Sequence, residues 1–183
     1  MVLPRTTFSI CLQAYLYRTA RDLEELLPFS PAIRLVKGAY MEPPEIAYPK
    51  KADTDANYLA LARMLLENRR KHQLTIAIAT HDEALIKRIE QDARYLGLSK
   101  DDYEVQFLYG IKSEEQERLV KEGHSVRVLI NYGSYWFPWY VRRLAERPAN
   151  VFFVLKNLIS LRKSPTVADS REPVATETHG CVV

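Results

Sequence analysis

The chain has 183 residues, enough for one domain with a sizeable hydrophobic core. Its hydrophobic content of 47% and charged content of 27% are typical of a water-soluble globular protein. The formal net charge of +3 is too small to indicate a nucleic-acid partner without a localised basic face. No apolar stretch reaches the roughly 18 residues of a membrane-spanning helix.

The two cysteines, Cys11 and Cys181, show neither a disulfide framework nor the spacing of a metal site. A reducing compartment is therefore expected. The N-terminus also lacks the basic segment and long apolar region of a signal peptide. We expect a cytoplasmic protein without a bound metal.

Short apolar runs alternate with helical patterns along most of the chain. Strands are predicted over residues 7–16, 32–40, 74–80, 103–110 and 125–133. Helices are predicted over residues 21–27, 53–72, 85–96 and 117–123. Ser113 and Gln116 have the spacing of a capping box before the last of these helices, and Gly97 is expected to end the third.

The segment 53–72 carries the clearest helical pattern. Its apolar residues recur at helical spacing and predict one buried face, formed by Tyr58, Leu61, Ala62, Leu65 and Leu66. Asp53, Thr54 and Asp55 are N-cap candidates for this helix, and their negative charge suits its first turn.

Two further helices are expected at about 135–146 and 150–162. The polar segment 164–183 has no helical or strand period and is predicted to be a disordered tail. Residues 1–163 would then form the folded portion, and 164–183 the tail.

Strand–helix alternation predicts an α/β fold with a parallel sheet. It allows two arrangements, an open doubly wound sheet or part of a (β/α)8 barrel. No G-x-G-x-x-G opens a helix, and Tyr40, Thr80, His81 and Tyr109 follow three different strands. This distribution favours the C-terminal rim of a TIM barrel. The chain has about five strand–helix units, plus a C-terminal helix, so the barrel would be partial.

The stretch "RLVKGAY", residues 34–40, places cations in an otherwise apolar strand. Pleating puts Arg34 and Gly38 on one face and Lys37 on the other. A cation facing a barrel interior requires an anion or a polar ligand. Two interpretations remain open. Arg34 and Gly38 contact a ligand, or Arg34 pairs with a structural carboxylate while Lys37 faces the surface.

His81 stands at the end of a predicted strand, where it could bond a cofactor or belong to the structure alone. Arg142 and Arg143 are adjacent on a predicted helix. Their guanidinium groups could converge on a small carboxylate, which planar forks bind well, or they could both be ordinary surface residues.

Six motifs in order carry a likeness to a known family: "LQAYLYR", "RLVKGAY", "DTDANYLALARMLL", "ATHD", "FLYGI" and "YWFPWYVRRLAERPAN". Together they closely resemble flavin-dependent proline dehydrogenase of the short, monofunctional bacterial form, and the resemblance covers about residues 8–161. The resemblance implies a distorted (β/α)8 barrel that holds FAD and oxidises L-proline to 1-pyrroline-5-carboxylate. Hydride would pass to flavin N5 and electrons to membrane quinone, which leaves open a peripheral position at the inner membrane.

The resemblance also implies roles for individual residues. Arg34 would lie against the flavin ring as the catalytic residue. Further FAD contacts would come from Gln13, Arg34, Lys37, Gly38, Ala39, Thr80, His81 and Glu146. The substrate would be held through its carboxylate by Arg142 and Arg143, and its ring would be enclosed by Tyr40, Leu108 and Tyr140.

The sequence departs from the family pattern in two ways. Leu129 stands where the family has a tyrosine in the last strand, which relaxes substrate contacts or changes which cyclic amine fits. The family's early strands supply a lysine for the substrate carboxylate and an aspartate for the flavin-side arginine, and this chain resembles only the C-terminal half. Arg34 is therefore expected to lack its anionic partner, and the first strand to have an exposed edge.

These departures leave three hypotheses open. The chain is a flavin-dependent proline dehydrogenase, or it is an inactive fragment or half barrel completed by a polypeptide that supplies the missing strands. As a third hypothesis, Leu129 suggests a flavin enzyme acting on a related cyclic amine.

Overall fold

The computed structural model describes residues 9–38, 40, 42–130 and 132–133. Within them, five strands alternate with helices: β1 (Ser9–Gln13), α1 (Thr19–Leu26), the 3₁₀ helix η1 (Leu27–Phe29), β2 (Ala32–Val36), α2 (Lys51–His72), β3 (Thr75–Ala79), α3 (Glu83–Tyr95), β4 (Glu104–Leu108), α4 (Ser113–Lys121) and β5 (Ser125–Leu129).

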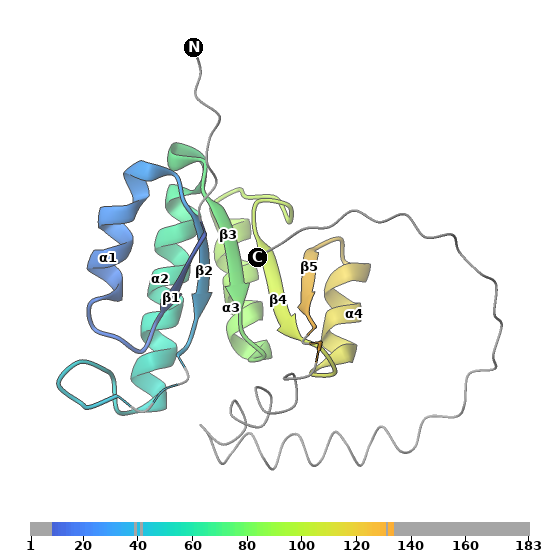
Figure 1. Cartoon of the computed structure of the whole chain (residues 1–183). Coiled ribbons are helices and arrows are strands. Elements are labelled where there is room, and N and C mark those ends of the chain that lie inside the picture. Colours follow the sequence, from blue (N-terminus) through green and yellow to red (C-terminus); the bar gives the residue numbers. More distant parts are fainter. Residues whose placement is uncertain (1–8, 39, 41, 131, 134–183) are drawn as a thin grey trace.

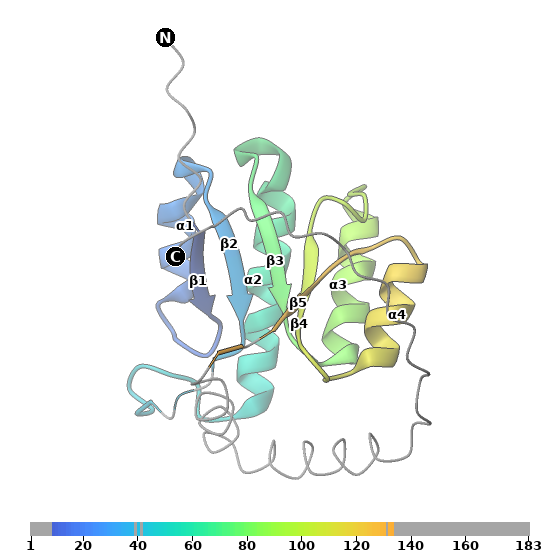
Figure 2. The same ribbon diagram turned by 45° about the vertical axis from the view of Figure 1, so that its right-hand side comes forward.

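All five strands are parallel and pair in sequence order, β1-β2-β3-β4-β5 (Figure 1). A doubly wound sheet reverses its strand order at a switch point, whereas successive strands of a barrel lie side by side. The helices lie along one side of the sheet, which a turned view shows with the strands in front (Figure 2). The described residues confirm an α/β fold with the arrangement of part of a TIM barrel.

The two faces of the sheet differ in burial. On β2, buried Ile33 and Leu35 alternate with half-buried Ala32, Arg34 and Val36. Strand β4 repeats this pattern, with Val105 and Phe107 buried. Side chains alternate across a strand, so each strand directs one row toward the helices and the other toward the face on which no described helix lies.

The core fills the space between the sheet and helices α2 and α3. Helix α2 contributes its predicted apolar face, with Tyr58, Leu61, Ala62, Leu65 and Leu66 all 2% exposed or less. The Tyr58 hydroxyl donates a hydrogen bond of 3.1 Å to the Leu35 carbonyl. This bond attaches α2 to the back of β2, the strand that carries Arg34.

Some predicted helix ends need correction. Helix α2 begins at Lys51, and none of the N-cap candidates at 53–55 precedes it. The predicted capping box does not form, because Ser113 is already the first residue of α4 and Gln116 donates to the Ile111 carbonyl instead. Helix α3 ends before Gly97 as predicted, and Gly97 has a φ of 68°.

The predicted helices at 135–146 and 150–162 and the predicted tail at 164–183 lie outside the described residues. Among the residues that the structure describes, no helix is long and apolar enough to cross a membrane.

Candidate functional site

Arg34 extends across the sheet on the face away from the helices. Its Nε donates a 2.7 Å hydrogen bond to Oε1 of Gln106, and its NH1 nitrogen lies 3.6 Å from Sγ of Cys11. Gln106 belongs to β4 and Cys11 to β1. One guanidinium group therefore links strands on both sides of its own.

Small residues on β3 make this reach possible. β2 and β4 are separated by β3 and so lie about 10 Å apart. The β3 residues level with Arg34 and Val36 are Ala77 and Ala79. Their methyl groups leave room for the long Arg34 side chain to cross β3 and meet Gln106. Larger residues at these two positions would block that path.

The contact continues beyond Gln106. The Gln106 Nε2 donates to a carboxylate oxygen of Glu104 two residues earlier on the same strand. Glu104 in turn accepts hydrogen bonds of 2.9–3.1 Å from Nε and NH2 of Arg127 on β5. We call Arg34, Gln106, Glu104 and Arg127 the cross-strand ladder.

Lys37 points to the helix side, as the pleat predicts. Its Nζ lies 2.6 Å from Oδ1 of Asp55 and 2.8 Å from Oδ2 of Asp82, and its side chain is only 15% exposed. Asp55 is in the second turn of α2, and Asp82 is the N-cap residue of α3. Lys37 is thus neither on the surface nor on the same face as Arg34, and the ion pairs hold the pKa values of both aspartates below their ordinary range, against the opposing effect of burial.

Position 38 requires a glycine, because of its backbone conformation and because the Tyr15 ring lies beside it. It has a φ of 111°, a region that side chains disfavour. A Cβ atom here would also lie 2.0 Å from Cδ1 of the Tyr15 ring. The close approach that the glycine permits is therefore made by Tyr15, whose backbone N–H bonds to the Lys37 carbonyl at 2.9 Å.

Thr80 and His81 follow β3 directly. Thr80 is 6% exposed, and its Oγ1 accepts a 3.2 Å hydrogen bond from the Asp82 N–H at the start of α3. The His81 ring packs beside Phe107 with 5.7 Å between centroids. Its Nδ1 is buried, and no group in the described part of the chain hydrogen-bonds to it.

Burial lowers the pKa of His81 to about 4, assisted by the positive charges of Arg34 and Lys112. The imidazole is therefore neutral at pH 7, so that one ring nitrogen carries a proton and the other can accept a hydrogen bond. A buried nitrogen without a protein partner at a strand end is a natural contact for a bound polar group.

The remaining predicted residues are placed as follows. Gln13 ends β1 and Leu108 ends β4, both on the same face as Arg34 and both half-buried. Leu129 ends β5 beside Leu108 and is 45% exposed, and Tyr40 is 48% exposed. The described range does not include Ala39, Tyr140, Arg142, Arg143 and Glu146, and their roles stay predictions.

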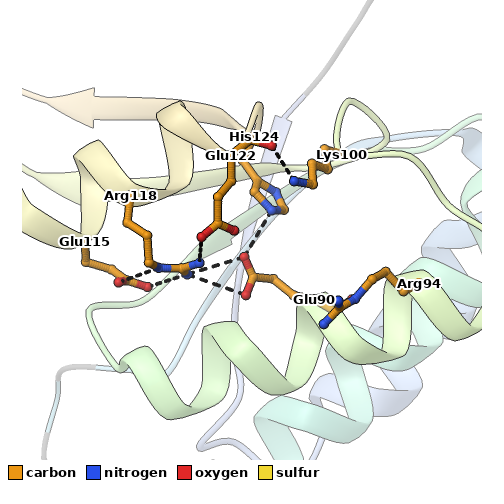
Figure 3. A network of polar contacts seen from close by, with 7 residues as sticks. All are labelled: Glu90, Arg94, Lys100, Glu115, Arg118, Glu122 and His124. Carbon is orange, nitrogen blue, oxygen red and sulfur yellow. Dashed lines mark hydrogen bonds and ion pairs between the residues drawn. The ribbon is translucent and has the colours of Figure 1, made fainter.

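A second polar network lies between α3, α4 and the start of β5 (Figure 3). Arg118 is at its centre and contacts Glu115 and Glu122 at 2.7 Å each and Glu90 at 3.4 Å. His124 Nε2 lies 3.0 Å from Oε1 of Glu90. A cavity of about 80 Å³ adjoins the network on the side of Glu90, Tyr103 and His124.

Glu90, Glu122 and His124 have the side-chain types and proximity of a metal site, with potential ligand atoms within 4.8 Å of one another. Both carboxylates, however, already contact the Arg118 guanidinium. A divalent cation would have to displace that charge. The carboxylates of this network are therefore already paired with Arg118, and we interpret the network as a structural contact between helices.

Comparison with known proteins identifies the family. The family model for proline dehydrogenase matches residues 3–156, most of the chain. The chain belongs to the proline dehydrogenase family. Proline dehydrogenase 2 of Bacillus subtilis strain 168 is 46% identical over 150 residues, which cover 82% of this chain and 48% of that protein. Proline dehydrogenase of Deinococcus radiodurans strain R1 is 42% identical over 148 residues, which cover 81% and 46%.

Solved structures agree with this membership. Proline utilization A from Bdellovibrio bacteriovorus, inactivated by N-propargylglycine, matches with a TM-score of 0.69 and 32% identity, covering 75% of this chain and 16% of that one. A bifunctional proline utilization A also matches with a TM-score of 0.69, at 26% identity over 84% and 17% of the two chains. The chain spans about half the length of the curated proline dehydrogenases it matches.

Sequence reasoning missed the partners of Arg34. Glu104 and Gln106 alternate with buried Val105 and Phe107 in "EVQFL", and this period of two could have placed them on the same face as Arg34. It could not have shown contact, because Arg34 and Gln106 are 72 residues apart in sequence.

Proposed function

We propose that this chain forms the C-terminal half of an FAD-dependent proline dehydrogenase barrel. L-proline would be oxidised to 1-pyrroline-5-carboxylate, as part of proline catabolism. The observation that carries the proposal is Arg34, a cation held by hydrogen bonds on the sheet face away from the helices, within a chain whose family is proline dehydrogenase. Its surroundings suit a bound anionic or electron-rich ring better than a structural carboxylate.

The described residues fit a flavin at the carboxyl end of the strands. Arg34 offers guanidinium N–H groups on this face, and Gln13 offers an amide at the end of β1. The unpartnered Nδ1 of His81 offers a buried polar contact at the end of β3. Lys37 and Gly38 shape the site from behind, through Asp55, Asp82 and Tyr15.

When bound, FAD would supply the acceptor for the hydride, one proton together with two electrons, that proline loses from the carbon beside its nitrogen that does not carry the carboxylate. The amine loses one proton in forming the C=N bond. Arg34 places a positive charge where it stabilises the electron-rich reduced cofactor. By the family pattern, Arg142 and Arg143 hold the substrate carboxylate, while Tyr40, Leu108 and Tyr140 enclose the ring.

A second polypeptide that completes the barrel is favoured by the sheet edges. Within the described residues, β1 and β5 each pair on one side only. Unpaired edges of a parallel sheet readily accept further strands. The chain also covers 48% of the relative from Bacillus subtilis strain 168. We therefore include, as the second candidate, a half barrel that acts only when a partner supplies the remaining strands.

The proposed electron acceptor is a membrane quinone. Two electrons and two protons from the reduced cofactor would convert it to the quinol. This chemistry requires a cytoplasmic protein to dock at the inner membrane. Sedimentation of the enzyme with washed membranes would support this location, and its recovery only in the supernatant would contradict it.

Reconstitution with FAD tests the proposal. The purified chain, incubated with FAD and freed of excess by gel filtration, is expected to be yellow, with absorbance near about 450 nm. Proline added without oxygen should bleach this band, and the R34M variant should bleach far more slowly. A colourless chain that becomes yellow only with a co-expressed N-terminal half would select the second candidate. No flavin in either preparation would contradict both.

Substrate choice needs its own measurement because Leu129 replaces a family tyrosine. Initial rates with proline, hydroxyproline and pipecolate are compared between the wild type and the L129Y variant. Proline is expected to be the best of the three. A clear preference for pipecolate would redirect the proposal to a related cyclic-amine dehydrogenase.

A further inference from the structure

We propose that Gln106 and Glu104 are positioning residues, which hold the Arg34 guanidinium in place for the flavin. The inference rests on the proposed function for its purpose and on the cross-strand ladder for its geometry. The ladder runs from β2 to β4 through two hydrogen-bonded steps, Arg34 to Gln106 and Gln106 to Glu104. Arg127 then fixes Glu104.

The order of donors and acceptors gives the ladder a direction. The Glu104 carboxylate accepts hydrogen bonds and donates none. The Gln106 amide must therefore turn its NH₂ group to Glu104, which leaves its oxygen facing Arg34 Nε at 2.7 Å. Glu104 thus selects the amide orientation that Arg34 needs, although it does not contact Arg34 itself.

Glu104 is held by a fork. Nε and NH2 of Arg127 both bond to it at 2.9–3.1 Å, and its side chain is 16% exposed, against 70% for Arg127. Two parallel N–H···O bonds constrain a carboxylate in both distance and angle. The solvent-facing Arg127 therefore fixes the position of the Glu104 carboxylate. The fixed carboxylate orients the Gln106 amide, and the amide orients Arg34.

An amide partner also preserves the charge of Arg34. Gln106 accepts the Nε–H without adding a negative charge, whereas the aspartate that the family pattern pairs with this arginine would come from the missing half. The ladder contains two cations and one anion and so keeps one net positive charge. The bond to Gln106 uses Nε and NH1 lies 3.6 Å from Sγ of Cys11, so the two terminal nitrogens still carry N–H groups that a ligand could accept from. This arrangement both aims the cation and leaves it able to stabilise a reduced flavin.

The geometry is tested first on the chain without flavin. The Arg34 Nε–H signal in a ¹H–¹⁵N spectrum is assigned by its loss in R34K. In Q106L, this proton is expected to exchange with water about tenfold faster, because it has lost its acceptor. E104Q should have a smaller effect, since its amide oxygen can still accept from Gln106. The exposed Gln91 on α3 supplies the control Q91L, which should change nothing.

The purpose is tested by the midpoint potential of bound FAD and by its dissociation constant. Q106L should make the potential more negative and weaken FAD binding about tenfold, whereas Q91L should shift neither. If Gln106 had only a structural role, Q106L would lower the stability of the fold and leave the midpoint potential of FAD unchanged.

The outcomes separate the two proposals. Unchanged exchange at Arg34 in Q106L overturns the positioning role, whatever the flavin does. Faster exchange together with an unchanged potential also overturns it, because the orientation then has no consequence for the cofactor. Faster exchange in a chain that binds no FAD, alone or with an N-terminal half, supports the hydrogen-bond assignment and overturns the proposed function.

Discussion

The cross-strand ladder and the helix network around Arg118 both contain arginine and glutamate, but their central arginines have different partners. In the helix network, Arg118 meets three carboxylates, of which Glu115 is only 6% exposed and Glu90 11%. In the ladder, Arg34 meets a neutral amide and lies on the sheet face away from the helices. One arginine is surrounded by anions, while the other is aimed by hydrogen bonds and keeps its charge.

This difference distinguishes the structural cluster around Arg118 from the ladder, for which we propose a function. A buried carboxylate needs a cation to offset its desolvation, and Arg118 forms this ion pair with Glu115. Arg34 forms no ion pair with a buried carboxylate among the described residues. The cost of burying its charge is therefore offset by its hydrogen bonds and by a ligand bound on that face. Both clusters contain arginine and glutamate, and only their partners and surroundings tell them apart.

The largest expected effect is on the helix network. R118M should lower the free energy of unfolding by about 3 kcal/mol, because Glu115 and Glu90 lose a charged partner. Urea unfolding measures this change. The R21M variant in the exposed Arg21–Glu25 pair is the control and should show no measurable change. FAD affinity should be the same in R118M as in the wild type, and a large loss would contradict the separation of the two clusters.

Acid should lower the free energy of unfolding through protonation of His81. The unfolded chain binds a proton at this ring near pH 6.5 and the folded chain only near pH 4. The unfolded state therefore binds more protons between these values, and the free energy of unfolding should fall by about 2 kcal/mol from pH 7 to pH 5 through His81 alone. Urea unfolding at both pH values should show a smaller fall in H81N, because that variant cannot titrate there. An identical fall would show that the folded ring protonates freely.

Arg34 should matter more to flavin than to folding. R34M is expected to change the free energy of unfolding by less than about 1 kcal/mol, since it leaves no buried carboxylate unpaired. FAD binding, followed by titration of the flavin absorbance, should weaken by about tenfold or more, because a charged hydrogen-bond donor is lost. A loss of stability equal to that of R118M, with flavin binding intact, would make Arg34 a structural residue.

The smallest expected effect on stability is at the outer end of the ladder. Arg127 is 70% exposed, so R127A should cost about 0.5 kcal/mol or less. Salt should remove most of this difference, because exposed ion pairs are screened. Unfolding curves at low and high salt provide the check. A cost above about 2 kcal/mol that persists in salt would show that Glu104 depends on Arg127 as buried carboxylates depend on Arg118.

Periodicity was sufficient to predict most of the fold. The alternation of Ile33 and Leu35 with Arg34 gave β2 its two faces, and the spacing of Tyr58, Leu61 and Leu65 gave α2 its buried side. These patterns are local, because a strand repeats every two residues and a helix every 3.6. Helix starts were less predictable. Ser113 has the chemistry of an N-cap, but Lys112 occupies that position with a φ of 57°.

For the two cations in "RLVKGAY", the face of the strand followed from the sequence and the partners came from the structure. The sequence by itself determined that Arg34 and Lys37 lie on opposite faces, because pleating depends only on spacing. Only the tertiary structure decided their partners, which come from elements distant along the chain: Asp55 and Asp82 for Lys37, and Gln106 for Arg34. Glu104 bonds to the Gln106 amide and not to Arg34 itself, and no local pattern connects that amide to β2.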